Sequence, residues 1–199
     1  RGRFGGFEGR ALQTGDVIPI GKSSFNIERA GRYLPQDKRP RYDDKMIEVI
    51  LGPQEDHFSA ESIRTFLNSD YEITSTSDRM GYRLNGPALT HRGSPDIISD
   101  GMALGAIQIP ANGQPILMMS DHATTGGYPK IAAVVSADIS VVAQHLSVGA
   151  GLAPARVGQP QGLPLRFKQT TIESAQERYR VMMRNLKQIV EPEENFYFG

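Results

Sequence analysis

The sequence predicts a mainly β protein with a short helix and a C-terminal amphipathic helix. Three patterns carry this prediction. Two apolar runs, 107–109 and 116–119, flank Asn112-Gly113, a dipeptide that suits a type I′ hairpin turn because both central residues need positive φ. Short runs of β-branched or alternating apolar residues recur along the middle of the chain. Near the C-terminus, apolar residues recur at spacings of three and four, which is typical of one amphipathic helix.

The first 44 residues are expected to form a glycine-rich entry segment followed by a charged linker. A short strand is expected at 17–20, and the stretch 22–45 contains two prolines and no sustained period, which favours a loop or linker. The segment "MIEVILG" (46–52) predicts a strand because it is rich in β-branched residues. A short helix is expected at 59–68, where Ser59 is placed to cap it and Ile63, Phe66 and Leu67 share one side.

The remaining elements belong to a predicted domain that covers residues 45–190. Alternation at Tyr71 and Ile73, and again at Met80, Tyr82 and Leu84, predicts two more strands. Further strands are expected at 131–136 and 165–170, the apolar segment between 137 and 146 is compatible with either type, and 147–164 favours a flexible loop. A capping box of Thr170 with Glu173 then begins the terminal helix, whose apolar stripe should pack on the barrel or on a partner: Ile172, Ala175, Tyr179, Met182, Leu186 and Ile189.

Composition narrows the function classes. The 22 basic and 22 acidic residues cancel, so net charge favours neither nucleic acid nor an anionic membrane as a partner. The chain has no cysteine, which excludes disulfides and thiolate metal sites and makes a cytoplasmic location the natural interpretation. No apolar stretch is long enough to span a bilayer. The tail at 191–199 resembles an engineered protease site, and the start without methionine suggests a fragment of a longer protein.

The stretch "SDHATTGGYPK" (120–130) concentrates chemically active groups. Residues 124–127 can turn so that successive N–H groups point into one concavity that binds anionic or carbonyl oxygens. Asp121 and Lys130 can supply acid–base or charge-stabilising groups, and Tyr128 a stacking face. The same residues also make a good tight turn, and local spacing does not decide between the two interpretations.

A second candidate is "TSTSDRMGYRLNG" (74–86). It is either a strand with a bulge at Gly81 and solvated or paired charges, or a site where Arg79 binds a carboxylate or carbonyl beside the wall of Tyr82. Composition alone favours the first interpretation. The four histidines, His57, His91, His122 and His145, fit no metal-ligand spacing, so no metal site is predicted, and His57 and His91 are expected at the surface.

The motifs "GGFEGRALQTGD", "SDRMGYRLNG" and "PANGQPILMMSDHATTGGYPKIA" together resemble the biotin-dependent carboxyltransferase-like family. That family includes the C subunit of bacterial ATP-dependent 5-oxoprolinase, the protein labelled allophanate hydrolase subunit 2, the Kip-type antagonist of a kinase inhibitor, and the carboxyltransferase region of urea carboxylase. The resemblance runs from about residue 2 to 146 and resumes at "LPLRFKQTTIESA". Members have a similar-sized half before "GGFEGRAL", so this chain resembles the C-terminal half.

The resemblance implies a cyclophilin-like β-barrel at roughly 45–169 and one pocket shared by the two candidate segments. In that pocket the implied catalytic residues are Asp121, Lys130 and Arg79. The implied substrate-binding residues are Tyr82, Thr124, Thr125, Gly126, Gly127 and Tyr128. The sequence departs from the family's pattern at Ala123, where a glutamine is expected. Without the donor and acceptor of that amide, the implied chemistry can be altered or lost.

The function implied is that of part of a subunit of an ATP-dependent 5-oxoprolinase, or of a related enzyme that handles a lactam- or urea-type carbonyl. The chain has no P-loop, so ATP is expected on the assembled complex and not on this chain alone, and carboxybiotin would arrive on another protein. Implied partners are the family's B-type, Kip inhibitor-like subunit, an A subunit and the other half of the same chain. The alternative implied by the family is a non-catalytic regulatory module that antagonises a histidine-kinase inhibitor.

Overall fold

The computed structural model describes residues 7–19, 21, 33–39, 46–145 and 164–187, which fall into two units. The first unit comprises 1–34 with 189–199, and the second comprises 35–188. In the first unit, Arg10 forms an ion pair with Asp16 at 2.8 Å, and Asp16 Oδ2 accepts the backbone N–H of Gln13. Residues 17–19 form no strand. The predicted strand at 17–20 is therefore wrong over its described part, and Ile20 lies outside the described residues.

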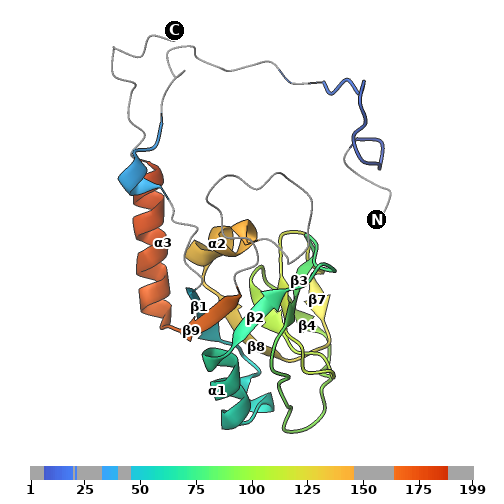
Figure 1. The fold of residues 1–199 in the computed structure, drawn as a ribbon, viewed down its shortest axis with the longest axis vertical. Coiled ribbons are helices and arrows are strands. Elements are labelled where there is room, and N and C mark those ends of the chain that lie inside the picture. Colours follow the sequence, from blue (N-terminus) through green and yellow to red (C-terminus); the bar gives the residue numbers. More distant parts are fainter. Residues whose placement is uncertain (1–6, 20, 22–32, 40–45, 146–163, 188–199) are drawn as a thin grey trace. The chain divides into compact units, whose positions relative to one another are not determined.

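The second unit is built on a closed β-barrel, which confirms the predicted fold class (Figure 1). Neighbouring strands follow the order β1-β8-β5-β6-β3-β2-β9, and every pair is antiparallel except β1 with β9. The strands are β1 Met46–Leu51, β2 Asp70–Ile73, β3 Gly81–Asn85, β5 Ala106–Gln108, β6 Ile116–Met118, β8 Lys130–Val134 and β9 Leu165–Gln169. A separate two-stranded ribbon pairs β4 Asp100–Gly101 with β7 Thr125–Gly126.

Helical segments accompany the barrel. They are η2 Gln36–Lys38, η3 Glu55–His57, α1 Ala60–Asn68, η4 Ser136–Asp138, α2 Ile139–Gln144 and α3 Ile172–Leu186. The segment whose type the sequence left open is thus helical, in η4 and α2. Within the described residues, no helix is both long enough and apolar enough to cross a membrane.

The barrel core follows from the alternation of side chains along each strand. Ile47 and Val49 of β1 are fully buried and alternate with partly or fully exposed neighbours, and Ile107 of β5 is also fully buried. Helix α1 begins as predicted, since the Ser59 side chain accepts the N–H of Ser62. The α1 residue Phe66 stacks on Phe167 of β9 with ring centroids 4.7 Å apart. This contact packs α1 against the barrel core.

The hairpin predicted around Asn112-Gly113 is confirmed, but its turn type is wrong. Strands β5 and β6 pair antiparallel, and the Gly113 N–H donates to the Pro110 carbonyl at 2.9 Å. Gly113 has φ of +74°, whereas Asn112 is not in the left-handed region, so the turn is not type I′. The Gly113 carbonyl accepts the N–H of Leu89 at 3.0 Å. A tertiary hydrogen bond, absent from an isolated hairpin, therefore accompanies this turn.

The cap of α3 is one residue later than predicted. Thr170 donates its N–H to the Val49 carbonyl at 2.9 Å, so it still continues the β1–β9 ladder. The helix begins after it, with Thr171 as the capping residue that accepts the N–H of Ser174. The capping box of Thr170 with Glu173 is therefore wrong.

A charged cluster attaches α3 to the barrel. Arg178 donates to both carboxylate oxygens of Asp138, at 2.6 and 3.1 Å, and to Glu48 at 2.8 Å. Asp138 is almost fully buried and also accepts the N–H of Glu48. The apolar stripe is less well covered: no α3 residue is buried, and Ile172, Tyr179 and Leu186 are all exposed. The described barrel therefore does not bury this stripe, its burial against a partner stays a prediction, and Ile189 lies outside the described residues.

We expect Asp138→Asn to lower the free energy of unfolding by about 1–3 kcal/mol, because it removes a buried acceptor for a charged donor. Urea denaturation followed by circular dichroism measures the change. Asp37→Asn is the matched control, because Asp37 is an exposed carboxylate in η2, and it should leave the midpoint unchanged. Equal midpoints for Asp138→Asn and the wild type would show that the cluster does not hold the helix.

Candidate functional site

Within 120–130, Thr125–Gly126 form the short extended strand β7. Asp100 pairs with Gly126 and Gly101 with Thr125 in the β4–β7 ribbon. Gly126 and Gly127 are not among the described glycines with positive φ, so the expected turn of successive N–H groups is not formed. A Cβ on Gly126 would collide with the terminal methyl carbon of Met102 and lie 3.0 Å from Gln108 Oε1. A larger residue at this position would require the ends of the Met102 and Gln108 side chains to shift, because the ribbon lies close to both of them.

Lys130 sits in a cluster that local sequence reasoning did not identify. Its Nζ donates to Asp100 Oδ2 at 2.9 Å, and Gln54 Nε2 donates to the same oxygen at 3.1 Å. Gln54 Oε1 also accepts the backbone N–H of Lys130. The Lys130 side chain is only 6% exposed, whereas that of Asp100 is 52% exposed. A register shift between β5 and β8 falls at this point, and such irregularities commonly redirect side chains.

The hydrogen bond from Lys130, with smaller contributions from the Gly101 N–H and Gln54, holds the pKa of Asp100 below its ordinary value of 3.8. The cluster therefore presents a partly exposed carboxylate that stays ionised, backed by a buried ammonium group. The Asp100 carboxylate can accept a hydrogen bond from a ligand or bind a cation from solvent, while Lys130 still compensates its charge.

Arg79 and Asp121 come together as the sequence suggested, but in an ion pair with each other. Nε and Nη2 of Arg79 each lie 3.1 Å from one Asp121 oxygen, and the Asp121 N–H donates to the Arg79 carbonyl at 2.8 Å. The pair caps the end of the β3–β6 ladder and is largely exposed. Exposed pairs of this kind contribute about 0–1 kcal/mol.

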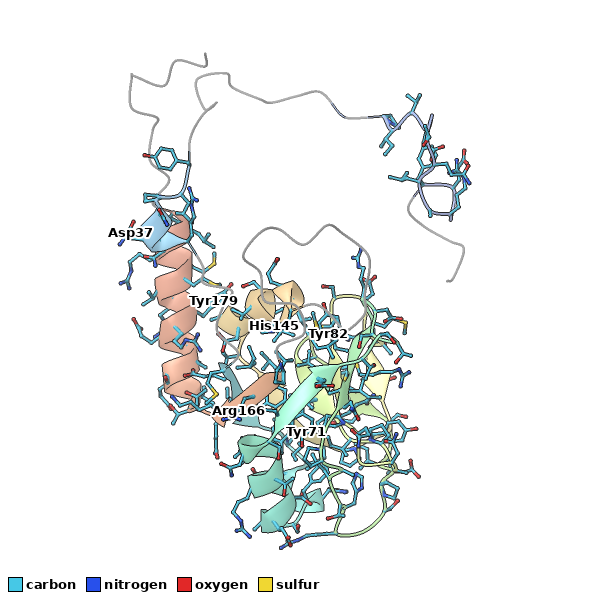
Figure 2. All side chains as sticks on the ribbon, in the orientation of Figure 1. Asp37, Tyr71, Tyr82, His145, Arg166 and Tyr179 are labelled. Carbon is cyan, nitrogen blue, oxygen red and sulfur yellow. The ribbon has the colours of Figure 1, made fainter. Side chains whose placement is uncertain are left out.

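Tyr82, expected to lie beside Arg79 and to face Asp121 and Lys130, is directed toward the barrel core instead. It lies opposite Leu117 in the β3–β6 ladder and packs against the hydrophobic core; Tyr82 is labelled in Figure 2. Burial raises the pKa of the Tyr82 hydroxyl. Gly81, where a bulge was considered, pairs in regular register with Met118.

A polar cleft of about 610 Å³ lies on the outer face of β2, β3, β6 and β5. Outward side chains meet there in rows across the strands: Arg83 and Gln108 both lie opposite Ile116, and Glu72 lies opposite Asn85. The lining also includes Thr74, Thr76, Pro110, Asn112, Gln114 and Tyr128. Of the predicted binding residues, Tyr128 thus reaches the cleft, while Gly126 packs behind it on Gln108.

The cleft contains polar groups that the protein itself leaves unused. Within the described residues, neither the Arg83 guanidinium nor the Glu72 carboxylate has a hydrogen-bond or ion-pair partner, and the buried Gln108 Oε1 accepts no hydrogen bond. Amide side chains supply both donors and acceptors, and a guanidinium supplies charged donors. The arrangement therefore suits a small ligand with a carbonyl or carboxylate oxygen and an N–H group.

Sequence reasoning chose Arg79 over Arg83 and missed Asp100 and Gln54. A signal for Arg83 was present, since alternation with the inward Tyr82 and Leu84 places its side chain on the outer face. No comparable local signal marks Asp100 or Gln54, because they are joined to Lys130 only in the folded chain.

The histidines show a further difference. His91 was expected at the surface but is half-buried; its Nε2 lies 3.0 Å from the Ile109 carbonyl oxygen and its ring packs on Phe58. His57 is also half-buried. No group of three histidine or acidic side chains that could hold a metal occurs among the residues described here.

We expect Lys130→Met to raise the pKa of Asp100 toward its ordinary value of 3.8, because it removes the main hydrogen-bond donor. In the wild type the lowered pKa means that the cluster stabilises the fold above pH 3.8. That contribution is lost as the pH falls through the lower, folded-state pKa. Carboxyl-carbon NMR titration of Asp100 measures the shift. Lys168→Met, which removes a lysine 3.8 Å from Glu48, is the control and should leave the Asp100 titration unchanged.

Comparison with known proteins agrees with the motifs. The family model described as "Carboxyltransferase domain, subdomain A and B" matches residues 1–150. The chain is 35% identical to the C subunit of the Escherichia coli 5-oxoprolinase over 94% of its own length, and 30% identical to the urea amidolyase of Saccharomyces cerevisiae over 72%. It spans 54% of the first relative and 9% of the second. The structure of the K. lactis urea amidolyase matches 99% of this chain and 13% of that one with a TM-score of 0.68 at 22% identity, a likeness of fold. The predicted resemblance is thus confirmed: the chain belongs to the family of the carboxyltransferase domain, subdomains A and B.

Proposed function

We propose that this chain is part of a subunit of an ATP-dependent 5-oxoprolinase, or of a related enzyme that handles a lactam or urea, and that it acts with a partner subunit. Two relatives support the proposal by name, a 5-oxoprolinase subunit and a urea amidolyase. Both names refer to compounds in which a carbonyl carbon is bonded to nitrogen. The observation that carries the proposal for this chain is the unpartnered Arg83 guanidinium, which lines the same cleft as Gln108, one strand away on either side of Ile116.

The cleft residues would bind and orient the substrate. Arg83 would donate charge-assisted hydrogen bonds to a carbonyl or carboxylate oxygen, a contact worth about 1.5–3 kcal/mol. The Gln108 amide oxygen, which is buried in this structure, would have to turn toward the cleft to accept an N–H from a lactam or urea. Tyr128 would form one side wall and exclude water from the bound face.

The other predicted residues would contribute where a second subunit meets this one. We propose that Lys130 with Asp100, and Arg79 with Asp121, present charge to a reaction centre completed by a partner. Asp121, Lys130 and Arg79 thus stay candidate catalytic residues. We further propose that ATP is bound by another part of the complex and that any carboxybiotin is delivered on another protein. In this division of labour the present chain holds the carbonyl compound.

We expect Arg83→Ala to lower kcat/KM for 5-oxoproline or urea at least about tenfold, because it removes one charge-assisted hydrogen bond. The measurement is substrate-dependent ATP hydrolysis, together with biotin-dependent carboxylation, by the full-length protein assembled with its candidate partner subunits. Arg166→Ala is the matched control: Arg166 is paired with Asp70 at 2.7 Å on the β2–β9 side and does not line the cleft. Unchanged kinetics in Arg83→Ala would remove the cleft from the proposal.

We also expect the 199-residue chain by itself to show no 5-oxoproline-dependent ATP hydrolysis. Turnover without partner subunits would contradict the division of labour. Assembly of a complex that binds a kinase inhibitor but turns over none of these substrates would favour the regulatory alternative instead.

A further inference from the structure

Two side chains of the barrel unit converge on one carboxylate oxygen of the β4–β7 ribbon (Figure 1). Lys130 Nζ, on β8, donates to Asp100 Oδ2 at 2.9 Å, and Gln54 Nε2, in the loop after β1, donates to the same oxygen at 3.1 Å. Gln54 is itself oriented, because its Oε1 accepts the backbone N–H of Lys130 at 3.2 Å. The two donors are therefore positioned by β8 and by each other, without help from Asp100.

The donors and their acceptor are fixed to different extents. The Lys130 side chain is only 6% exposed, and a buried charge is costly unless an opposite charge compensates it. The Asp100 side chain is 52% exposed and belongs to a two-residue strand, which pairs Asp100 with Gly126 and Gly101 with Thr125. The buried lysine thus always requires an anion, whereas the group that meets this requirement lies at an exposed edge. A carboxylate from solution can replace Asp100 without leaving the lysine uncompensated.

This cluster adjoins the polar cleft. Gln108 lies opposite Lys130 in the β5–β8 ladder, so both side chains are on the same face of the sheet, and Gln108 lines the cleft. The ribbon covers this point, because a Cβ on Gly126 would lie 3.0 Å from Gln108 Oε1. That oxygen is buried and accepts no hydrogen bond within the described residues. Movement of the ribbon away from Lys130 would extend the cleft to the lysine and would give Gln108 Oε1 access to a donor.

We propose that Lys130 Nζ and Gln54 Nε2 form a binding site for a small planar carboxylate-type anion, and that Asp100 is its displaceable internal occupant. The bound anion accepts the two hydrogen bonds that Asp100 Oδ2 accepts in this structure. Asp100 then turns to solvent, where water compensates its charge, and the ribbon loses its attachment to Lys130. The proposal deepens the proposed function and rests on it for the role of the bound anion. Its test measures binding without turnover, so either can fail without the other.

The test is a formate titration of the 199-residue chain at neutral pH, with chloride exchanged for formate so that the ionic strength stays constant. The side-chain amide resonance of Gln54 in proton–nitrogen correlation spectra reports binding, and the wild type should show a saturable shift. Asp100→Ala should lower the dissociation constant at least about tenfold, because the wild-type site is accessible only in the fraction of molecules from which Asp100 has moved away. Asp96→Ala is the matched control: it removes an exposed carboxylate from the segment before β4 and should bind formate as the wild type does.

Two further variants separate this site from a general effect of anions. Lys130→Met should abolish the saturable shift, because the charged donor is lost. Asp100→Asn keeps the shape of the side chain and should also bind formate more tightly than the wild type, which gives the same comparison if Asp100→Ala does not fold. A saturable shift that Lys130→Met leaves unchanged would overturn the proposal, and so would aspartate variants that bind formate no more tightly than the wild type.

The displacement of Asp100 has its own readout in the wild type. The Asp100 carboxyl-carbon resonance should move with the same formate constant. The Met102 N–H, which donates to the Thr124 carbonyl at 2.9 Å beside the ribbon, should exchange with deuterium faster at saturating formate. An Asp100 resonance that stays fixed while that of Gln54 responds would contradict displacement.

Competition identifies the source of the anion. We expect both 5-oxoproline and bicarbonate to displace formate, since each presents two oxygens on one carbon. Stronger competition by 5-oxoproline would assign the site to a substrate carboxylate, and stronger competition by bicarbonate would assign it to a free inorganic anion. Failure of both to compete would overturn the assignment to this class of ligand.

Discussion

The parallel pairing of β1 with β9 is the constraint on which the rest of the structure depends. It joins Met46–Leu51 to Leu165–Gln169, segments more than a hundred residues apart in the chain, and closes the strand order into a barrel. Closure leaves no free sheet edge in the barrel. It also divides every strand into an inner and an outer set of side chains. Because the inner set is apolar and packed, polar groups that can act on a ligand are confined to the outer face and to the connecting loops.

The candidate site is a direct consequence of that division. Arg83, Ile116 and Gln108 come from three neighbouring strands and lie in one row only because the registers of β3–β6 and β5–β6 align them. The β4–β7 ribbon then covers the edge of this row, with Gly126 flat on Gln108. The same ribbon carries Asp100 to the buried Lys130. One short covering element therefore shapes the cleft and pairs the buried ammonium group.

The attachment of α3 to the barrel depends on the end of a strand ladder and on an ion pair. Strand β9 leads directly into this helix, so its starting point is set by the end of the β1–β9 ladder at Thr170. A buried carboxylate, Asp138, then orients the helix through Arg178. Removing one partner of such a buried ion pair is costly because the other charge is left uncompensated. In this arrangement the apolar residues Ile172, Tyr179 and Leu186 of the helix stay exposed.

Local sequence determined the type and position of most elements. Strand β1, helix α1 with its Ser59 cap, the β5–β6 hairpin and α3 all follow from side-chain periodicity and capping groups, which depend on near neighbours. The family motifs predicted the barrel, and the alternation of side chains along β3 was sufficient to indicate that Arg83 points outward. Only the tertiary structure decided which charges remain available. Arg79 is compensated by Asp121, Lys130 by Asp100, and Arg83 by no described residue, because these partners are separated by tens of residues and meet only when the strands come into register. Contacts between distant segments likewise decided the conformation of the turn at Gly113 and the exposure of the apolar stripe of α3. A pattern of neighbouring residues does not reveal which tertiary hydrogen bonds or ion pairs will form.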